Sequence, residues 1–402
     1  MATALLLSMS SFAQQALFDN VPVVSPELNA NHTVTFRLKA PNAQKVQITG
    51  DFLPTKQIDT PVGKYDAPGV ADLVKDDKRV WSFTSTNLSP ELYSYNLILD
   101  GVKIVDPGNV YITRDITSET NIFILSDKKG DCGDLYTVNE VPHGNVQKVW
   151  YDSPTLKMQR RMTVYTPAGY DKGKDYPVLY LLHGAGGDED AWTTLGRAQH
   201  ILDNLIATGK AKPMVVVMTN GNPNCQAAPG EWSAGMYVPS FYGYQGAKAV
   251  ATMDESFPDV MNYVESHYKV GKDKTHRAIC GLSMGGGHSF DISRRFPNKF
   301  DYVGLFSAGL HVGKTGDFRT DFYKMLQEDE EAKQQLATLF KNKPKLYWIG
   351  MGKTDFLYKS TAGLRRYFDE KGYKYTYMET EGGHIWRNWR VYLTEFAQKI
   401  FK

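Results

Sequence analysis

Residues 277–290, RAICGLSMGGGHSF, contain a short apolar run that ends at a serine with a glycine two positions away on either side. The stretch from Gly281 to Gly285 matches G-x-S-x-G, in which a strand turns sharply through a serine into a helix. Side chains at the two glycine positions would collide with such a turn, which lifts the serine hydroxyl above the sheet. The stretch predicts a strand–turn–helix unit with a nucleophile at Ser283. The alternative is an ordinary tight turn between a strand and a helix.

The sequence around this stretch alternates between apolar strands and helices. Strand candidates lie at residues 162–167, 178–184, 214–221, 277–283, 302–309, 345–352 and 374–383. Helix candidates lie at residues 254–267, 317–340, 361–371 and 386–400. Continuous apolar strands between helices are typical of a parallel sheet covered on both faces. We therefore predict an α/β domain, with a mostly parallel sheet and helices on both faces, over residues 145–402.

The first third of the chain has a different pattern. Residues 32–40, 45–52, 80–86, 92–101 and 119–125 alternate polar and apolar residues and are separated by turn residues, as in antiparallel strands. Several such strands predict a small β-sandwich over residues 18–126, followed by a polar linker at 127–144. Residues 1–17 hold an apolar run and a small-x-small pattern, which predicts a truncated signal peptide and a secreted or periplasmic protein; a frayed apolar N-terminus is the alternative.

Composition excludes several classes of protein. The 402 residues carry a formal charge of +2, so no electrostatic case exists for nucleic acid or an anionic membrane surface. No run after the N-terminal segment approaches the roughly 20 apolar residues that span a bilayer. The histidines show no His-x₃-His or HExxH spacing, and we expect neither metal nor cofactor. The three cysteines imply no disulfide framework, and a bond between Cys132 and Cys225 is left open.

The predicted nucleophile needs a base. A serine hydroxyl attacks near neutral pH only with a histidine beside it, and α/β-hydrolases place serine, acid and histidine in that chain order. His384 lies in the glycine-rich loop between the last strand and the last helix candidate, so we predict it as the base instead of a helix-capping loop residue. His311 breaks the order and is expected in the cleft wall, and His288 is expected to pack or to support the site.

The acid is expected at a strand end between Ser283 and His384. Asp355 follows the strand candidate 345–352 after a short turn, so we predict it as the carboxylate that orients the histidine. Asp317 and Asp321 open a polar helix and fit the commoner role of charges at a helix N-terminus.

An oxyanion hole requires two backbone N–H groups aimed at one point. The segment HGAGG, residues 183–187, follows a strand and is small enough for its backbone to approach a ligand. We predict the N–H groups of Ala185 and Met284 as the two donors. A plain glycine-rich turn is the alternative at residues 183–187.

Four motifs in the same order, HGAGGDEDAW, GLSMGGGHS, WIGMGKTDFLY and GGHIWRNWR, resemble carbohydrate esterase family 1. This family holds bacterial feruloyl and acetyl xylan esterases within the esterase D-like α/β-hydrolases, and the resemblance covers residues 145–402. It implies the same triad, the same oxyanion donors, an acyl-enzyme intermediate and no cofactor. Two segments, TFRLKAPNAQKVQITGDF and YSYNLILDGVKIVDPGN, resemble early-set immunoglobulin-like modules of the family 48 carbohydrate-binding type. The resemblance implies an immunoglobulin-like sandwich, in which we expect Trp81 to be a core residue.

Aromatic residues offer surfaces for a ring or a sugar. The long loop at residues 220–246 leaves a strand at the edge where open α/β sheets bind ligands. For each aromatic side chain, sealing the loop against the core is the competing interpretation. The substrate-binding candidates are Trp192, Trp232, Tyr237, Phe356, Tyr358 and Trp386.

The resemblance places a plant cell-wall polysaccharide first among partners. Feruloyl esters of arabinoxylan are the first choice of substrate, and acetyl esters of xylan, alone or in addition, are the second. A siderophore trilactone esterase is a third reading. A carbohydrate-binding protein with an inactive esterase domain is the alternative outside enzymes. If the sandwich is only an appended binder, residues 145–402 alone should retain activity on methyl ferulate.

Overall fold

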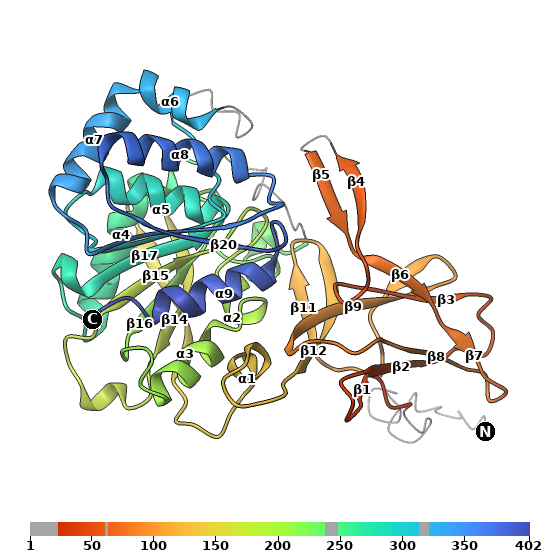
Figure 1. Cartoon of the computed structure of the whole chain (residues 1–402). Coiled ribbons are helices and arrows are strands. Elements are labelled where there is room, and N and C mark those ends of the chain that lie inside the picture. The colour runs from red at the N-terminus through yellow and green to blue at the C-terminus, as the bar shows by residue number, and fades with distance from the viewer. Residues whose placement is uncertain (1–22, 61–62, 238–247, 313–320) are drawn as a thin grey trace, which may run out of the picture.

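A computed structural model describes residues 23–60, 63–237, 248–312 and 321–402. It places an all-β part beside an α/β part (Figure 1). The predicted signal peptide, Asp317 and residues 238–246 of the long loop lie outside the described residues. None of the helices in the described ranges is long and apolar enough to cross a membrane.

The α/β part is built on an eight-stranded sheet in the order β13-β14-β16-β15-β17-β18-β19-β20. The strands are β13 (Asn145–Ser153), β14 (Met158–Thr166), β15 (Val178–Leu182), β16 (Val215–Thr219), β17 (Arg277–Leu282), β18 (Tyr302–Phe306), β19 (Leu346–Gly352) and β20 (Thr376–Thr380). Neighbours from β16 to β20 pair in parallel, whereas β13–β14 and β14–β16 are antiparallel. The prediction of a mostly parallel sheet is confirmed. The antiparallel strand β13 was not among the predicted strands.

Helices cover both faces of this sheet, as predicted. One apolar core lies between the sheet and α4 (Met253–His267), α5 (Met284–Arg295), α6 (Phe322–Glu328), α7 (Glu330–Lys341) and α8 (Tyr358–Lys371). A second core on the other face holds α1 (Cys132–Tyr136), α2 (Ala191–Thr194), α3 (Ala198–Ala207) and α9 (Trp386–Ala397). The single helix predicted at 317–340 is two helices, because Asp329 lies in extended backbone between them and caps α7.

The all-β part is a sandwich. One sheet has the order β1-β2-β8-β7 and the other β11-β12-β9-β3-β6, with β10 paired to β9 and a separate β4–β5 hairpin. The strands are β1 (Glu27–Leu28), β2 (Val34–Lys39), β3 (Val46–Gly50), β4 (Lys56–Thr60), β5 (Gly63–Ala67), β6 (Gly69–Asp72), β7 (Val74–Lys75), β8 (Val80–Thr84), β9 (Glu91–Leu99), β10 (Val102–Ile104), β11 (Ile112–Asp115) and β12 (Ser118–Leu125). Phe36, Tyr95 and Phe123 pack edge to face between the sheets. Trp81 is buried in the same core, which confirms its predicted role.

The predicted linker is not a loose connection. Its middle forms α1, whose Tyr136 side chain is buried. The Asn204 side chain on α3 donates to the carbonyls of Leu135 and Thr137, 3.0 Å away in each case. This middle segment of the predicted linker is therefore held against the α/β part of the chain.

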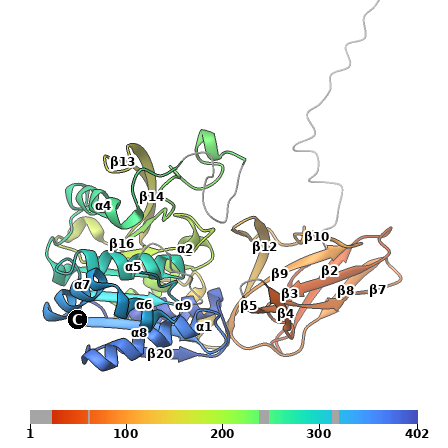
Figure 2. The same ribbon diagram turned by 90° about the horizontal axis from the view of Figure 1, so that it is seen from above.

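Further contacts join the two parts where they lie side by side (Figure 2). The buried Arg390 guanidinium on α9 donates to the Glu91 carboxylate and to the Leu92 carbonyl on β9, both at 3.2 Å, and to the Leu195 carbonyl at 3.0 Å. Because a buried cation is costly without a compensating charge, the contacts with Glu91 and Leu92 hold α9 against the sandwich.

Candidate active site

The elbow predicted at Ser283 is present. The strand β17 ends at Leu282, α5 begins at Met284, and Ser283 between them has φ 52° and ψ −115°. A positive φ is strained for a residue with a side chain and persists only where the surroundings enforce it. The Ser283 N–H donates to the Phe306 carbonyl at 2.9 Å, and the Ser283 carbonyl accepts from the N–H groups of Gly287 and Gly309 at 3.0 and 2.8 Å.

The glycines on either side are required by space. A Cβ at Gly281 would lie 2.6 Å from the carbonyl of Gly285 and 2.7 Å from the carbonyl oxygen of Leu182. A Cβ at Gly285 would lie 2.5 Å from the carbonyl oxygens of both Leu182 and His183. These neighbours are backbone atoms of β15, of the loop after it and of the first turn of α5, so they cannot move as freely as side-chain atoms. The predicted collision at the two glycine positions is thereby confirmed.

The predicted acid and base are joined. The loops that follow β19 and β20 carry Asp355 and His384, and parallel strands end at one edge of the sheet. The His384 Nδ1 atom lies 2.9 Å from Oδ2 and 3.1 Å from Oδ1 of Asp355. The carboxylate is fully buried and accepts a further hydrogen bond from the Leu357 N–H at 2.9 Å. A carboxylate at Nδ1 holds the proton on that nitrogen and leaves Nε2 as the basic atom.

The hydrogen bond from serine to histidine is not formed between these described residues. The His384 ring bonds the Asp355 carboxylate and not the Ser283 hydroxyl. Catalytic hydrogen bonds of this kind often tighten only when substrate is in place. The complete triad therefore stays a prediction, of which the structure supplies the strained serine and the joined Asp355–His384 pair.

The two predicted oxyanion donors have no competing acceptor among the described residues, because neither the Ala185 nor the Met284 N–H donates to another of these residues. The loop of Ala185 lies against the elbow, since a Cβ at Gly184 would come within 3.2 Å of the Ser283 Cβ. The Met284 N–H belongs to the first residue of α5, where the helix dipole favours negative charge. Their joint role in oxyanion binding remains a prediction.

A buried histidine shapes the loop of Ala185. His183 is 2 % exposed, its Nδ1–H donates to the Gly184 carbonyl at 2.7 Å, and its Nε2 accepts from the Gly221 N–H at 2.7 Å. These two partners require the neutral ring, and burial lowers the pKa of His183. His183 therefore ties the loop after β15 to the loop after β16.

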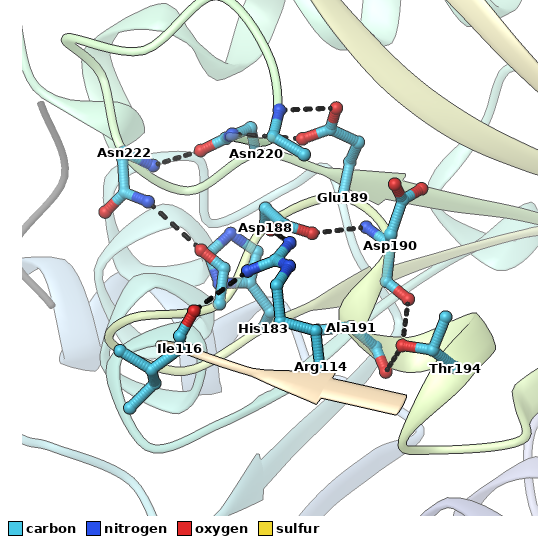
Figure 3. A network of polar contacts seen from close by, with 12 residues as sticks. Arg114, Ile116, His183, Asp188, Glu189, Asp190, Ala191, Thr194, Asn220 and Asn222 are labelled. Carbon is cyan, nitrogen blue, oxygen red and sulfur yellow. Dashed lines mark hydrogen bonds and ion pairs between the residues drawn. The ribbon is translucent and has the colours of Figure 1, made fainter. Parts of the chain in front are cut away.

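A second set of buried polar residues extends this connection (Figure 3). The Glu189 carboxylate, fully buried, pairs with Arg161 at 2.7 Å and accepts from the Asn220 amide at 3.0 Å and the Ala228 N–H at 2.9 Å. The Asn222 amide donates to the Gly187 carbonyl at 3.2 Å. This network was not predicted from the sequence, where its one visible sign is the acidic run at residues 188–190 after HGAGG.

The substrate-binding candidates divide by exposure. Trp192 was wrongly placed among them, because it is 1 % exposed and its indole N–H donates to the Leu182 carbonyl at 2.9 Å. Trp386 is half-buried and packs edge to face on Trp192.

Phe356 is 42 % exposed and lies 4.6 Å, ring to ring, from His384. The half-buried Tyr358 donates to Glu379 at 2.8 Å. Of the loop candidates, Trp232 is half-buried and Tyr237 is exposed.

The remaining histidines near the elbow differ in surroundings. His311 is exposed, with its Nε2 atom 3.7 Å from Asp291 on α5. His288 on α5 is half-buried, and no described residue bonds its buried Nδ1 atom. Burial, with nearby His183 and His311, lowers the pKa of His288 to about 3. His288 is therefore a packed neutral residue, as expected.

Comparison with known proteins identifies the family. The family described as "Putative esterase" matches residues 153–400, more than half of the chain. The chain belongs to this esterase family.

Two relatives refine the comparison. The chain is 30% identical over 388 residues to an endo-1,4-beta-xylanase/feruloyl esterase of Xylanibacter ruminicola, covering 94% of this chain and 46% of the relative. It thus spans about half the length of that protein. A ferulic acid esterase of Anaeromyces mucronatus in complex with ferulic acid is 26% identical, with a TM-score of 0.51, over 67% of this chain and 96% of the other. The chain therefore resembles feruloyl esterases and has their α/β-hydrolase fold.

A third structure resembles both parts of the chain. The enterobactin esterase of Shigella flexneri has a TM-score of 0.61 at 14% identity and covers 91% of this chain and 92% of the other. At this identity the likeness concerns the fold alone. It shows that a sandwich followed by an α/β-hydrolase domain is an arrangement shared with a solved structure.

The close approach at Gly285 predicts a substitution that runs against helix propensity. Alanine is favoured over glycine inside a helix by about 1 kcal/mol. Because the new Cβ of Gly285→Ala would meet two backbone carbonyls, we expect the free energy of unfolding to fall by about 1–3 kcal/mol instead, measured by urea unfolding. Gly309→Ala is the control, since its Cβ would meet only ordinary contacts of 3.5–3.8 Å. A Gly285→Ala protein as stable as Gly309→Ala would contradict this account of the elbow.

The lowered pKa of His288 predicts a loss of stability in acid. The unfolded chain binds a proton on this side chain near pH 6.5, whereas the folded pKa is about 3. The free energy of unfolding therefore falls as the pH drops from about 6.5 towards 3, by up to about 1.4 kcal/mol per pH unit from this group. We expect His288→Gln to flatten this dependence in urea unfolding at several pH values, and an unchanged slope would contradict it.

Proposed function

We propose that the chain is a serine esterase that removes feruloyl groups from plant arabinoxylan through an acyl-enzyme. The observation that carries the proposal is the strained Ser283 elbow at the sheet edge that also bears the joined Asp355–His384 pair. The names of the Xylanibacter and Anaeromyces relatives support the feruloyl substrate.

The proposed reaction has two halves. The Ser283 hydroxyl attacks the ester carbonyl while His384 Nε2 takes its proton, and the N–H groups of Ala185 and Met284 bind the developing oxyanion. The bond from the acyl carbon to the sugar oxygen breaks, and that oxygen leaves with the proton from His384. Water then attacks the acyl carbon, gives a proton to His384, and ferulic acid departs as Ser283 regains its proton.

The exposed aromatic side chains support an acyl group that carries a ring. Phe356 lies beside His384 and is partly exposed, so one of its faces can meet a ring bound next to the catalytic pair. The sandwich offers less support for sugar binding through Trp81, because this side chain is buried and its indole N–H donates to the Ala40 carbonyl.

The proposal predicts a preference among esters. At equal enzyme concentration, we expect faster release of acid from methyl ferulate and feruloylated arabinoxylan than from acetylated xylan or enterobactin, measured by chromatography of the products. A tenfold or greater preference for acetylated xylan would contradict the feruloyl assignment and favour an acetyl esterase. A preference for enterobactin would favour a siderophore esterase.

The same assay tests the nucleophile. We expect Ser283→Ala to lose at least about 10³-fold in kcat, because the acyl-enzyme cannot form. The control is Ser266→Ala, an exposed serine on α4 whose hydroxyl bonds only within its own helix and to its neighbour His267. If Ser283→Ala hydrolysed p-nitrophenyl acetate at the wild-type rate, another group would be the nucleophile; absence of turnover in all proteins would favour a carbohydrate-binding protein.

A further inference from the structure

The turn between β11 and β12 of the sandwich reaches the catalytic part. Arg114, near the end of β11, forms an ion pair with Asp188, five residues after His183 in the loop that follows β15. Figure 3 shows Arg114 and Ile116 lying against this loop. The turn connects two antiparallel strands of the sandwich, so its position depends on that sheet.

Within this ion pair, the Asp188 side chain is buried. Asp188 is 4 % exposed, and its carboxylate also accepts from the Asp190 N–H at 3.0 Å. Within the described ranges, Arg114 is the one cation paired with Asp188. Removing the partner of a buried charge is costly, because the remaining charge is left without compensation in a low dielectric. The negative charge of Asp188 is therefore compensated by an arginine of the sandwich.

The same arginine shapes the tip of the turn. Its Nη1 atom donates to the Ile116 carbonyl at 3.1 Å. Ile116 has a φ of 56°, which is rare for a β-branched residue and indicates a conformation enforced by its surroundings. Arg114 thus holds both the loop of the catalytic part and the strained residue that lies on it.

Ile116 covers the residue directly after the predicted oxyanion donor. Gly186 has a φ of 79°, and a Cβ there would lie 2.5 Å from Cγ1 and 2.8 Å from Cδ1 of Ile116. No described residue forms a hydrogen bond with the backbone of Ala185 or Gly186. The packing of Ile116 therefore restrains a segment that hydrogen bonds leave unsupported.

We propose that Arg114 and Ile116 of the sandwich are positioning residues for the oxyanion loop, holding the Ala185 N–H where the ester oxygen becomes charged. This inference rests on the proposed serine esterase function. It assigns the sandwich a part in catalysis, and it predicts that residues 145–402 without the sandwich lack the full rate.

The expected effect is on the transition state. A misplaced oxyanion donor weakens binding of the tetrahedral oxygen more than binding of the ground-state ester, and loss of one donor lowers kcat by about 10²–10³-fold. Because the substitutions loosen the loop without removing the donor, we expect Arg114→Ala and Ile116→Ala to lower kcat by about tenfold and to leave KM within about twofold.

The test uses the full chain and p-nitrophenyl acetate. The variants are Arg114→Ala, Ile116→Ala and Arg114→Lys, which keeps the charge and should recover part of the rate. The controls are Arg37→Ala, which breaks an exposed ion pair with Glu27 in the sandwich, and Ile112→Ala, an exposed residue of the same β11 strand. We measure kcat per active site by titration, together with the affinity of a boronic acid that forms a tetrahedral adduct on serine.

The outcomes separate the two proposals. A fall in both kcat and boronate affinity for Arg114→Ala and Ile116→Ala, but not for the controls, supports the inference. Wild-type kcat and affinity in both variants overturn it while leaving the esterase function intact. Fewer active sites with unchanged kcat and affinity also overturn it, because the residues would then act only on folding. Equal hydrolysis by wild type and Ser283→Ala would instead remove the proposed function.

Discussion

The site depends on how closely the backbone of β15 approaches the start of α5. The carbonyls of Leu182 and His183 lie where a side chain at Gly285 would begin, and Gly281 fits between Leu182 and Gly285. This contact closes the turn at Ser283 and keeps its φ positive. The strain at the serine is offset by the buried strands on either side, whose hydrogen bonds would be lost if the turn relaxed. A hydroxyl, a helix N-terminus and a glycine-rich loop are thereby brought to one edge of the sheet.

Three sets of buried polar contacts hold the loops around this edge of the sheet. His183 and Glu189 join the loops after β15 and β16 inside the catalytic part. Asp355 fixes His384 between the loops after β19 and β20. Arg114 comes from the sandwich and pairs with Asp188. These contacts join the loops after β15 and β16 to each other and to the sandwich, and they separately join the loops after β19 and β20.

The features that could be predicted from the sequence are those that depend on neighbouring residues or on a repeating pattern of apolar residues. The G-x-S-x-G turn, the apolar strands and the position of Asp355 after β19 follow from short patterns, because the physical causes lie within a few residues or one strand. Ion pairs between the parts have no such pattern: Arg114 and Asp188 are 74 residues apart. The prediction for Trp192 was wrong because an aromatic residue beside a glycine-rich loop can point into the core or into the cleft, and the sequence pattern is the same in both cases. The split of residues 317–340 depended on one capping aspartate.

The central claim is that Ser283 is the activated nucleophile of this esterase. The most direct measurement is reaction of the folded protein with a fluorophosphonate, followed by mass spectrometry of the digested chain. We predict a single phosphonylated residue, Ser283, and loss of labelling after unfolding in urea. A modification at another residue, or an unmodified native chain, would contradict the claim.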